Sequence, residues 1–302
     1  MRLIATILPG LLFSLAMTTA SAEGVRDFRA SLNEARWSVS GDRMSCRLTQ
    51  RIPDFGRAVF TAGAGNRIHL TFEMDRDPSP RAVRARLQVV APPWRSEPDR
   101  PLDRTTVRAN DRNLVVFSGE PARRALHALE EGLYPTLSYA SMDRRHRVAV
   151  SAVNLASRLE DFHTCTASLH PDSFEDVQNL RVRFGVDEHR LDAEARATLD
   201  RLLAYWEVDP TAEFAVLGGY SDRGGDSDYN EELAQLRVDA VHEYLVENGF
   251  PDERIVDLVW GEERPDTSGD ARSRDSGRRV EIQGPQTRAE QRRVEIKLRR
   301  EE

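Results

Sequence analysis

The hydrophobic pattern of this chain changes its period about halfway along the sequence, and this change constrains the fold more than any other feature. Up to residue 170, apolar residues alternate with polar ones, as at Ile68, Leu70 and Phe72, which is typical of half-buried strands. Beyond residue 172, short apolar runs alternate with segments whose apolar residues recur at helical spacing, as at Leu199 and Leu202. Two patterns within 302 residues predict two domains.

The first pattern predicts a β-rich domain over residues 23–170. Strands are expected at 67–74, 83–89, 114–117 and 148–153. The proline-rich stretch 91–101 is expected to be a loop. One helix is expected over 121–131, because Pro121 suits a first turn and Gly132 suits a C-terminal stop. The expected fold of this half is therefore β-rich with about one helix.

The second pattern predicts an α+β sandwich of the order β-α-β-α-β-β over residues 171–302. Its first three strands are expected at 180–184, 214–217 and 255–260, and its helices at 195–206 and 229–247. The last strand comes from a repeat, because Arg278-Arg279-Val280-Glu281-Ile282 recurs at 292–296 and each copy alternates as a strand does. Either copy can be the last strand of the sheet, or the two can pair as a hairpin across Gly284-Pro285.

Residues 1–22 have the pattern of a cleaved export signal. Arg2 supplies the positive charge, an apolar run follows to Met17, and Ala20-Ser21-Ala22 fits the small-residue cleavage site. A membrane span needs about 20 apolar residues, and this run is shorter. We therefore expect a mature chain that begins at Glu23, is exported and does not span the membrane.

The chain has two cysteines, Cys46 and Cys165. In an oxidising compartment an even number of cysteines predicts a disulfide. Two free thiols and a metal pair are the alternatives, but a metal ion needs more ligands nearby than His163 alone. We expect the disulfide, and no metal or other cofactor.

The overall charge argues against a nucleic-acid partner, because the formal net charge is −7. Basic clusters nevertheless occur, among them Arg144-Arg145-His146-Arg147. Such a cluster is either solvated loop charge or a contact for an acidic partner, and its composition does not distinguish the two.

One acid and one base in the second half can form a binding site. A predicted strand leads into Ser221-Asp222 and a glycine-rich loop, and Asp226 or Asp228 is placed to cap the helix that follows. Arg237 lies seven residues after Asn230 and four after Leu233, so all three share one side of that helix. An aspartate and an arginine that converge in this way suit a zwitterion. The alternative is a salt bridge between Asp222 and Arg237 themselves.

The same stretch resembles the peptidoglycan-binding domain of the OmpA family. That family's motif contains [TS]-D-x-x-G, then N-x-x-L-[SA]-x-x-R-A, then G-x-x-x-x-R. The matching residues here are Ser221, Asp222, Gly225, Asn230, Leu233, Ala234, Arg237, Gly249 and Arg254. The resemblance implies that Asp222 contacts the ammonium of diaminopimelate in the wall peptide and Arg237 its carboxylate, with Ser221, Asn230 and Leu233 in support. Val238 departs from the motif, which has alanine there, and neither Arg-Arg-Val-Glu-Ile copy is preceded by the family's asparagine.

The first half resembles the MotY family of flagellar motor ring proteins. The residues that carry this resemblance are Cys46-Arg47-Leu48-Thr49-Gln50-Arg51-Ile52-Pro53-Asp54-Phe55-Gly56, Pro92-Pro93-Trp94, Glu131-Gly132-Leu133-Tyr134-Pro135-Thr136, and Cys165 followed by Ser173-Phe174-Glu175-Asp176. The resemblance implies a periplasmic protein whose first domain docks on the flagellar basal body and a partner ring protein. Its wall-binding domain would then help to anchor the stator complex. Trp94 is a candidate docking residue, or a residue that packs its own loop.

Three other functions compete with this interpretation. An enzyme would need a nucleophile elbow, which Arg223 interrupts, or a glycosidase pair made by Asp222 with Glu231 or Glu232. A calcium loop would use Asp222, Asp226 and Asp228, but lacks the glutamate at its twelfth position. A general envelope anchor would share the wall-binding site and differ only in the partner of the first domain. We expect no catalysis.

Overall fold

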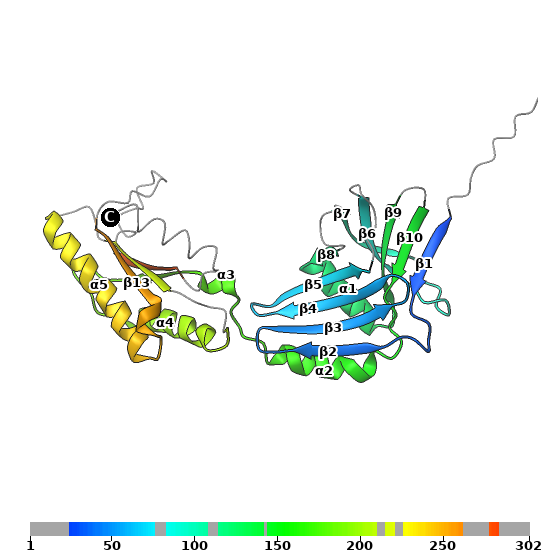
Figure 1. The fold of residues 1–302 in the computed structure, drawn as a ribbon, viewed down its shortest axis with the longest axis horizontal. Coiled ribbons are helices and arrows are strands. Elements are labelled where there is room, and N and C mark those ends of the chain that lie inside the picture. The colour runs from blue at the N-terminus through cyan, green and yellow to red at the C-terminus, as the bar shows by residue number, and fades with distance from the viewer. Residues whose placement is uncertain are drawn as a thin grey trace, which may run out of the picture.

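The computed structural model describes residues 24–75, 83–107, 114–141, 144–209, 215–220, 226–261 and 278–283. They form two domains (Figure 1), and each domain has its own hydrophobic core. The first is β-rich and the second combines helices with a sheet, which confirms the predicted fold class. The predicted export signal at 1–22 lies outside the described residues.

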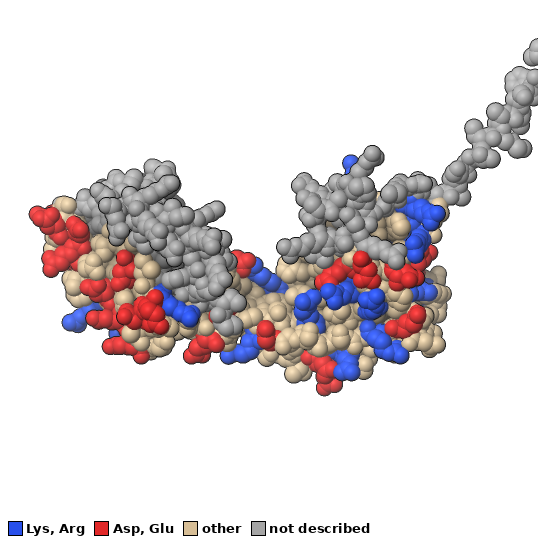
Figure 2. Space-filling model, viewed as in Figure 1, with Lys and Arg blue, Asp and Glu red and all other residues tan. Residues whose placement is uncertain are grey.

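The two domains differ in charge. Residues 23–170 contain 23 arginines against 18 acidic residues, whereas residues 171–302 contain 19 basic residues against 32 acidic ones. In the view of Figure 2, acidic side chains accordingly gather on the second domain and basic ones are spread over the first. The first domain is therefore basic, although the whole chain has a negative net charge.

The first domain contains two five-stranded sheets. One has the strand order β2 (Trp37–Gly41), β3 (Ser45–Ile52), β4 (Gly56–Gly63), β5 (Arg67–Met74) and β8 (Leu114–Ser118), all antiparallel. The other has the order β1 (Val25–Arg29), β10 (Arg144–Ala149), β9 (Tyr134–Ser141), β6 (Val83–Val90) and β7 (Arg100–Val107). Only the β1–β10 pairing in this second sheet is parallel.

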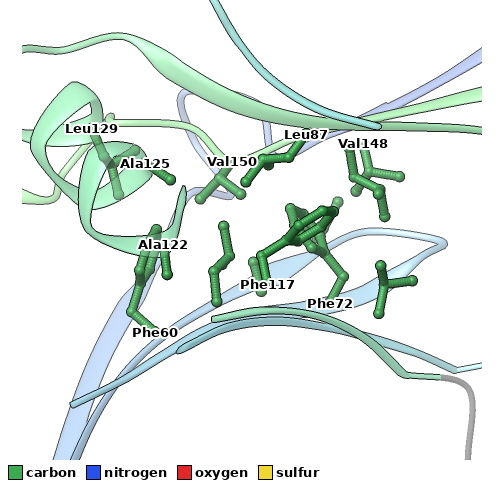
Figure 3. Close-up of a cluster of buried hydrophobic side chains, with 14 of the residues drawn as sticks. Phe60, Phe72, Leu87, Phe117, Ala122, Ala125, Leu129, Val148 and Val150 are labelled. Carbon is green, nitrogen blue, oxygen red and sulfur yellow. The ribbon is translucent and has the colours of Figure 1, made fainter. Parts of the chain in front are cut away.

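Side chains from both sheets meet in one core. Phe60, Phe72 and Phe117 of the first sheet face Leu87 and Val148 of the second (Figure 3). Along β3 and β5 every second side chain is buried, which is the alternation that the sequence predicts for half-buried strands.

Two helices pack against these sheets. Helix α1 (Glu120–Glu130) has Pro121 in its first turn and Gly132, with φ of +83°, directly after its end, as predicted. Helix α2 (Ala156–Ala167) was not predicted, so the expectation of about one helix is too low by one. Phe162 is its only buried residue and no side chain caps its N-terminus, so α2 has little of the periodicity that identifies a helix in sequence.

A disulfide joins α2 to the first sheet. It links Cys46 of β3 to Cys165 of α2, with 6.0 Å between the Cα atoms, as the sequence predicts. Gly41 makes room for the bond, because a Cβ at this position would lie 2.8 Å from the sulfur of Cys165. The bond closes a loop of 119 residues, which includes most of the first domain.

The second domain has one four-stranded sheet in the order β11 (Asn179–Arg183), β14 (Arg279–Gln283), β12 (Ala215–Tyr220) and β13 (Ile255–Gly261). Its helices are α4 (Ala193–Trp206) and α5 (Ser227–Glu247), with the short helix α3 (Phe174–Val177) before β11 and a 3-10 turn at Asp252–Arg254. From β11 onward the order is the predicted β-α-β-α-β-β. The first Arg-Arg-Val-Glu-Ile copy supplies β14 inside the sheet; the second copy at 292–296 and a hairpin across Gly284-Pro285 lie outside the described residues.

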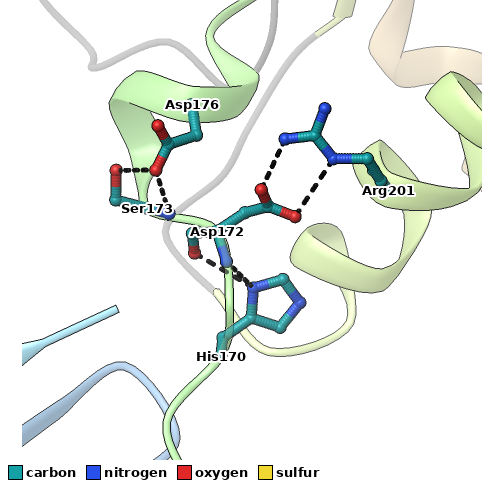
Figure 4. A network of polar contacts seen from close by, with 5 residues as sticks. All are labelled: His170, Asp172, Ser173, Asp176 and Arg201. Carbon is teal, nitrogen blue, oxygen red and sulfur yellow. Dashed lines mark hydrogen bonds and ion pairs between the residues drawn. The ribbon is translucent and has the colours of Figure 1, made fainter. Parts of the chain in front are cut away.

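The connection between the domains is held on both sides, and Figure 4 shows the contacts on the side of the second domain. On the first-domain side, the backbone N–H of His170 donates to Arg43 O at 2.7 Å, and Gly65 N–H donates to His170 O at 3.3 Å. On the second-domain side, Arg201 of α4 binds both carboxylate oxygens of Asp172, at 2.5 and 3.3 Å. The connection is thus tied to loops of one domain and to a helix of the other.

Helix α3 begins within this connection. The backbone N–H and the hydroxyl of Ser173 both donate to the Asp176 carboxylate, at 2.8 and 2.6 Å. Gly65 packs against this capping site, since a Cβ there would lie 2.7 Å from Asp176 Oδ2. Its φ of +71° also favours glycine.

A histidine joins α5 to the neighbouring strand. Nδ1 of His242 lies 2.7 Å from Asp257 of β13, and Nε2 lies 2.7 Å from Asp252. Partial burial alone would lower the pKa of His242, but the hydrogen bonds and charges of the two aspartates outweigh it, so the pKa is raised above its usual value near 6.5. The protonated histidine therefore stabilises this contact.

Reduction of the disulfide should destabilise the first domain by about 4–5 kcal/mol, because a loop of this length gains that much entropy in the unfolded chain when it is opened. Urea unfolding with and without a reductant measures the difference. The double variant Cys46→Ser/Cys165→Ser should be as unstable as the reduced wild type and insensitive to the reductant. Equal stability of the oxidised and reduced wild type would contradict the prediction.

His242→Gln should remove a pH-dependent part of the stability. A histidine whose pKa is raised by folding stabilises fully below the unfolded-state value near 6.5, and this contribution is lost as the pH rises through the folded-state pKa. The wild type should exceed the variant by at most about 1 kcal/mol below pH 6, because Asp252 is exposed to solvent, and the gap should close at alkaline pH. Denaturant unfolding across this range checks it, with the exposed His189→Gln as the control.

Candidate functional site

Helix α5 begins at a well-defined cap beside the predicted site. The carboxylate of Asp226 accepts from the backbone N–H groups of Asp228 and Tyr229, at 2.9 and 3.3 Å. Asp226 rather than Asp228 is therefore the N-cap, which decides between the two residues that the sequence offered. The cap sets where α5 starts and so which residues face the sheet.

Three predicted site residues lie on the buried face of α5. Asn230, Leu233 and Arg237 are 4%, 6% and 1% exposed, and they follow one another at helical spacing. Arg237 is the largest fully buried side chain of the described residues. The sequence predicted that these residues share a side of the helix, but not that the guanidinium is buried.

The guanidinium of Arg237 binds the backbone of the loop between β11 and α4. Its Nε donates to Glu188 O at 2.9 Å, and its Nη2 donates to Gly185 O at 3.1 Å. The group also lies over the ring of Phe184, 5.4 Å from the centroid. The loop between β11 and α4 is therefore organised around this one cation, a contact that sequence reasoning missed.

This burial gives Arg237 a structural role whether or not it binds a ligand. A buried charge is costly unless hydrogen bonds compensate it, and the two loop carbonyls are part of that compensation. A guanidinium has five N–H donors in a planar fork, so it can bind loop carbonyls along one edge and still direct donors elsewhere. Ser221 and Asp222 lie outside the described residues, so their approach to Arg237 remains a prediction.

The strand that leads to Ser221 runs very close to α5. A Cβ on Gly219 of β12 would lie 2.5 Å from Val238 Cγ2 and 2.9 Å from Ala234 O. Only glycine allows this approach, which brings the end of β12 against the turn of α5 that carries Arg237. Val238, which departs from the OmpA motif, is fully buried here and fills the space beside Gly219.

The described residues give little support to the competing functions. Glu231 and Glu232 are exposed on α5, away from the buried face that carries Arg237. Among the residues that the structure describes, no three or more histidine, cysteine, aspartate or glutamate side chains are grouped to hold a metal ion. Within the same residues, no helix is long and apolar enough to cross a membrane.

Trp94 lies on the first domain, far from α5 in the fold. It is 66% exposed, and its ring is nearly perpendicular to the ring of Tyr134, with 6.2 Å between the centroids. It therefore packs partly on its own domain while most of its surface faces solvent, which leaves both predicted roles open to test.

Comparison with known protein families identifies both domains. Residues 28–171 match the MotY N-terminal domain, and residues 183–279 match the OmpA family. The chain combines a MotY N-terminal domain with an OmpA domain. The OmpA match begins at the last residue of β11 and ends at the start of β14, so it contains α4, α5 and the buried Arg237.

Individual relatives agree with this composition. The chain is 29% identical to the sodium-type flagellar protein MotY of Vibrio parahaemolyticus, over 91% of this chain and 96% of that protein. Its OmpA domain is 33% identical to the peptidoglycan-associated lipoprotein of Pasteurella multocida, over 31% of this chain and 65% of that protein. The crystal structure of the peptidoglycan-associated lipoprotein from Burkholderia pseudomallei matches 34% of this chain and 88% of its own, with 28% identity and a TM-score of 0.32.

Arg237→Gln should destabilise the OmpA domain by about 2–4 kcal/mol, because it removes the charge and leaves the Gly185 and Glu188 carbonyls short of donors in a buried site. The stability of Arg237→Lys should lie between that of Arg237→Gln and that of the wild type, because a single ammonium keeps the charge but cannot reproduce the planar fork of donors. Urea unfolding followed by tryptophan fluorescence measures the loss. Arg196→Gln, an exposed arginine on α4, is the matched control, and an equal effect in both variants would refute a special role for Arg237.

Proposed function

We propose that this protein is a non-enzymatic component of the flagellar motor that binds peptidoglycan through its OmpA domain and helps to anchor stator units around the basal body. The observation that carries this proposal is the order of the two domains, because a MotY N-terminal domain precedes an OmpA domain. The sodium-type flagellar protein MotY of Vibrio parahaemolyticus aligns with 91% of this chain, across both domains. Two of the proteins that resemble the OmpA domain alone are named as peptidoglycan-associated lipoproteins.

Within the OmpA domain, Asp222 would receive the ammonium of a diaminopimelate residue and Arg237 would hold its carboxylate, with Ser221, Asn230 and Leu233 shaping the site. The geometry supports the arginine's part, because the guanidinium is buried, held by loop carbonyls and therefore preorganised. Each charge-assisted bond contributes about 1.5–3 kcal/mol, so a single site binds weakly. The wall offers many copies of the ligand, and effective concentration compensates.

The remaining parts of the proposal follow from the same comparison. Residues 1–22 would direct export to the periplasm, residues 23–170 would dock on the basal body and a partner ring protein, and residues 171–302 would hold the wall. The disulfide suits such an oxidising compartment. A general envelope anchor unrelated to motility remains the second candidate, because it would need the same OmpA domain.

Asp222→Asn should reduce retention on purified sacculi by about tenfold or more, because it removes one charge-assisted bond to the ligand and leaves the helix cap at Asp226 intact. Asp228→Asn makes the same charge change at an exposed position nearby and should be retained like the wild type. Co-sedimentation measures retention. Arg237→Lys is compared only at temperatures where unfolding shows that it is native, since this residue also stabilises the domain.

The same variants, returned to a strain that lacks the gene, separate the two candidate functions. The proposal expects Asp222→Asn to impair swimming while flagella remain assembled. Loss of sacculus retention with unchanged swimming would favour the general anchor, and undiminished retention would mean that Asp222 is not part of the site. Release of soluble wall fragments by the purified protein would contradict a non-enzymatic role.

A further inference from the structure

The outer face of one sheet of the MotY N-terminal domain carries two parallel rows of arginines. Arg84 and Arg86 lie on β6, and Arg145 and Arg147 lie on β10. All four are exposed, whereas the residues that alternate with them, such as Ala85, Leu87 and Val148, are buried in the core. The two rows therefore face away from the core on either side of the central strand β9.

Small residues of β9 form the floor between the rows. Ser138 pairs with Arg86 on one side and with Arg147 on the other, and Ala140 pairs with Arg145. Neighbouring strands lie about 4.8 Å apart, so the two rows are separated by about 10 Å. These residues line one open concavity, together with Arg104 of β7. We call the surface formed by Arg84, Arg86, Arg104, Ser138, Ala140, Arg145 and Arg147 the arginine trough.

The charges of the trough are only partly neutralised by the protein itself. Arg86 stands directly opposite Arg104 across β6 and β7, an arrangement of like charges that destabilises a sheet. Arg147 lies 3.7 Å from Asp27, but within the described part of the chain no acidic side chain forms an ion pair with Arg84, Arg86 or Arg104. The repulsion between the two guanidinium groups is unfavourable for folding. An anion that binds between them is attracted to both and relieves this repulsion.

We propose that the arginine trough binds a carboxylate-rich, extended segment of a partner protein. In an extended segment, side chains alternate between two sides and repeat on each side about every 6.6–6.8 Å. Arg84 and Arg86, like Arg145 and Arg147, are two residues apart on extended strands and have the same repeat. Successive acidic residues of a segment lying along β9 can therefore reach the two rows in turn, and each guanidinium can bind a carboxylate through two parallel hydrogen bonds.

The lining residues favour a peptide over a membrane surface. They include no tryptophan, phenylalanine or leucine, the side chains with which proteins usually enter a lipid interface. The proposal rests on the proposed function only in giving the first domain a protein partner. It concerns a surface remote from Asp222 and Arg237, and its test requires neither wall binding nor motility.

The test measures binding of a fluorescein-labelled octaglutamate peptide to the full mature chain by fluorescence anisotropy. Arg86→Ser/Arg147→Ser should weaken binding by about tenfold or more, because each change removes a charge-assisted contact. Arg123→Ser/Arg124→Ser removes the same charge from exposed positions on α1, which packs on the other face of the sheet, and should weaken binding less than about threefold. Arg86→Ser alone should leave the melting temperature unchanged or raised, since it relieves the repulsion with Arg104.

Arg86→Ser/Arg147→Ser, the trough variant, should be retained on sacculi like the wild type. A failure of the peptide-binding proposal is therefore distinguishable from a failure of the wall-binding proposal. Equal weakening by the trough and control variants would mean non-specific attraction and overturn the proposal. It would also be overturned if phosphatidylglycerol vesicles bind through these arginines while octaglutamate does not, which would indicate a lipid surface. The proposal would also be overturned if the unliganded wild type self-associates and Arg86→Ser/Arg147→Ser does not. In that case a second copy of the chain would occupy the trough.

Discussion

The buried guanidinium of Arg237 is the interaction on which the OmpA domain depends. It lies on a helix, but its hydrogen bonds go to the backbone of a loop that precedes another helix, so it joins parts of the chain about fifty residues apart. A cation of this size can be buried only if the surrounding backbone supplies acceptors. The arginine therefore determines the shape of the loop, and the loop holds the arginine in one orientation.

The proposed ligand-binding role of Arg237 would differ from that of an arginine at the protein surface. A binding arginine at the surface would pay the entropy of ordering a long side chain when the ligand arrives, whereas Arg237 is ordered before binding. Close packing at Gly219 adds to this order, because it brings the end of β12 directly onto α5. Under the proposed function one residue carries both a structural and a ligand-binding role, so mutational data on Arg237 need a measure of folding beside any measure of binding.

The two domains differ in how their cores are built and in the charge that they carry. The MotY N-terminal domain closes a sheet-lined core and ties an added helix to it with a disulfide, and it concentrates arginines on an outer sheet face. The OmpA domain buries its sheet under two helices and carries most of the acidic residues of the chain. A short, hydrogen-bonded connection around His170 and Asp172 joins them.

Local patterns in the sequence determined the elements with strong periodicity. Alternation identified the strands around Ile68 and Leu87, helical spacing identified α4 and α5, and turn residues identified the ends of α1 and α5, because these signals depend only on near neighbours. Two cysteines in a chain expected to be exported predicted the disulfide, and the aspartate-to-arginine spacing predicted the candidate site. Tertiary structure alone decided the rest: that α2 forms with a single buried residue, that β14 lies between β11 and β12, and that Arg237 is buried against Gly185 and Glu188. These features arise from contacts between residues distant in the chain, whose energies no local pattern records.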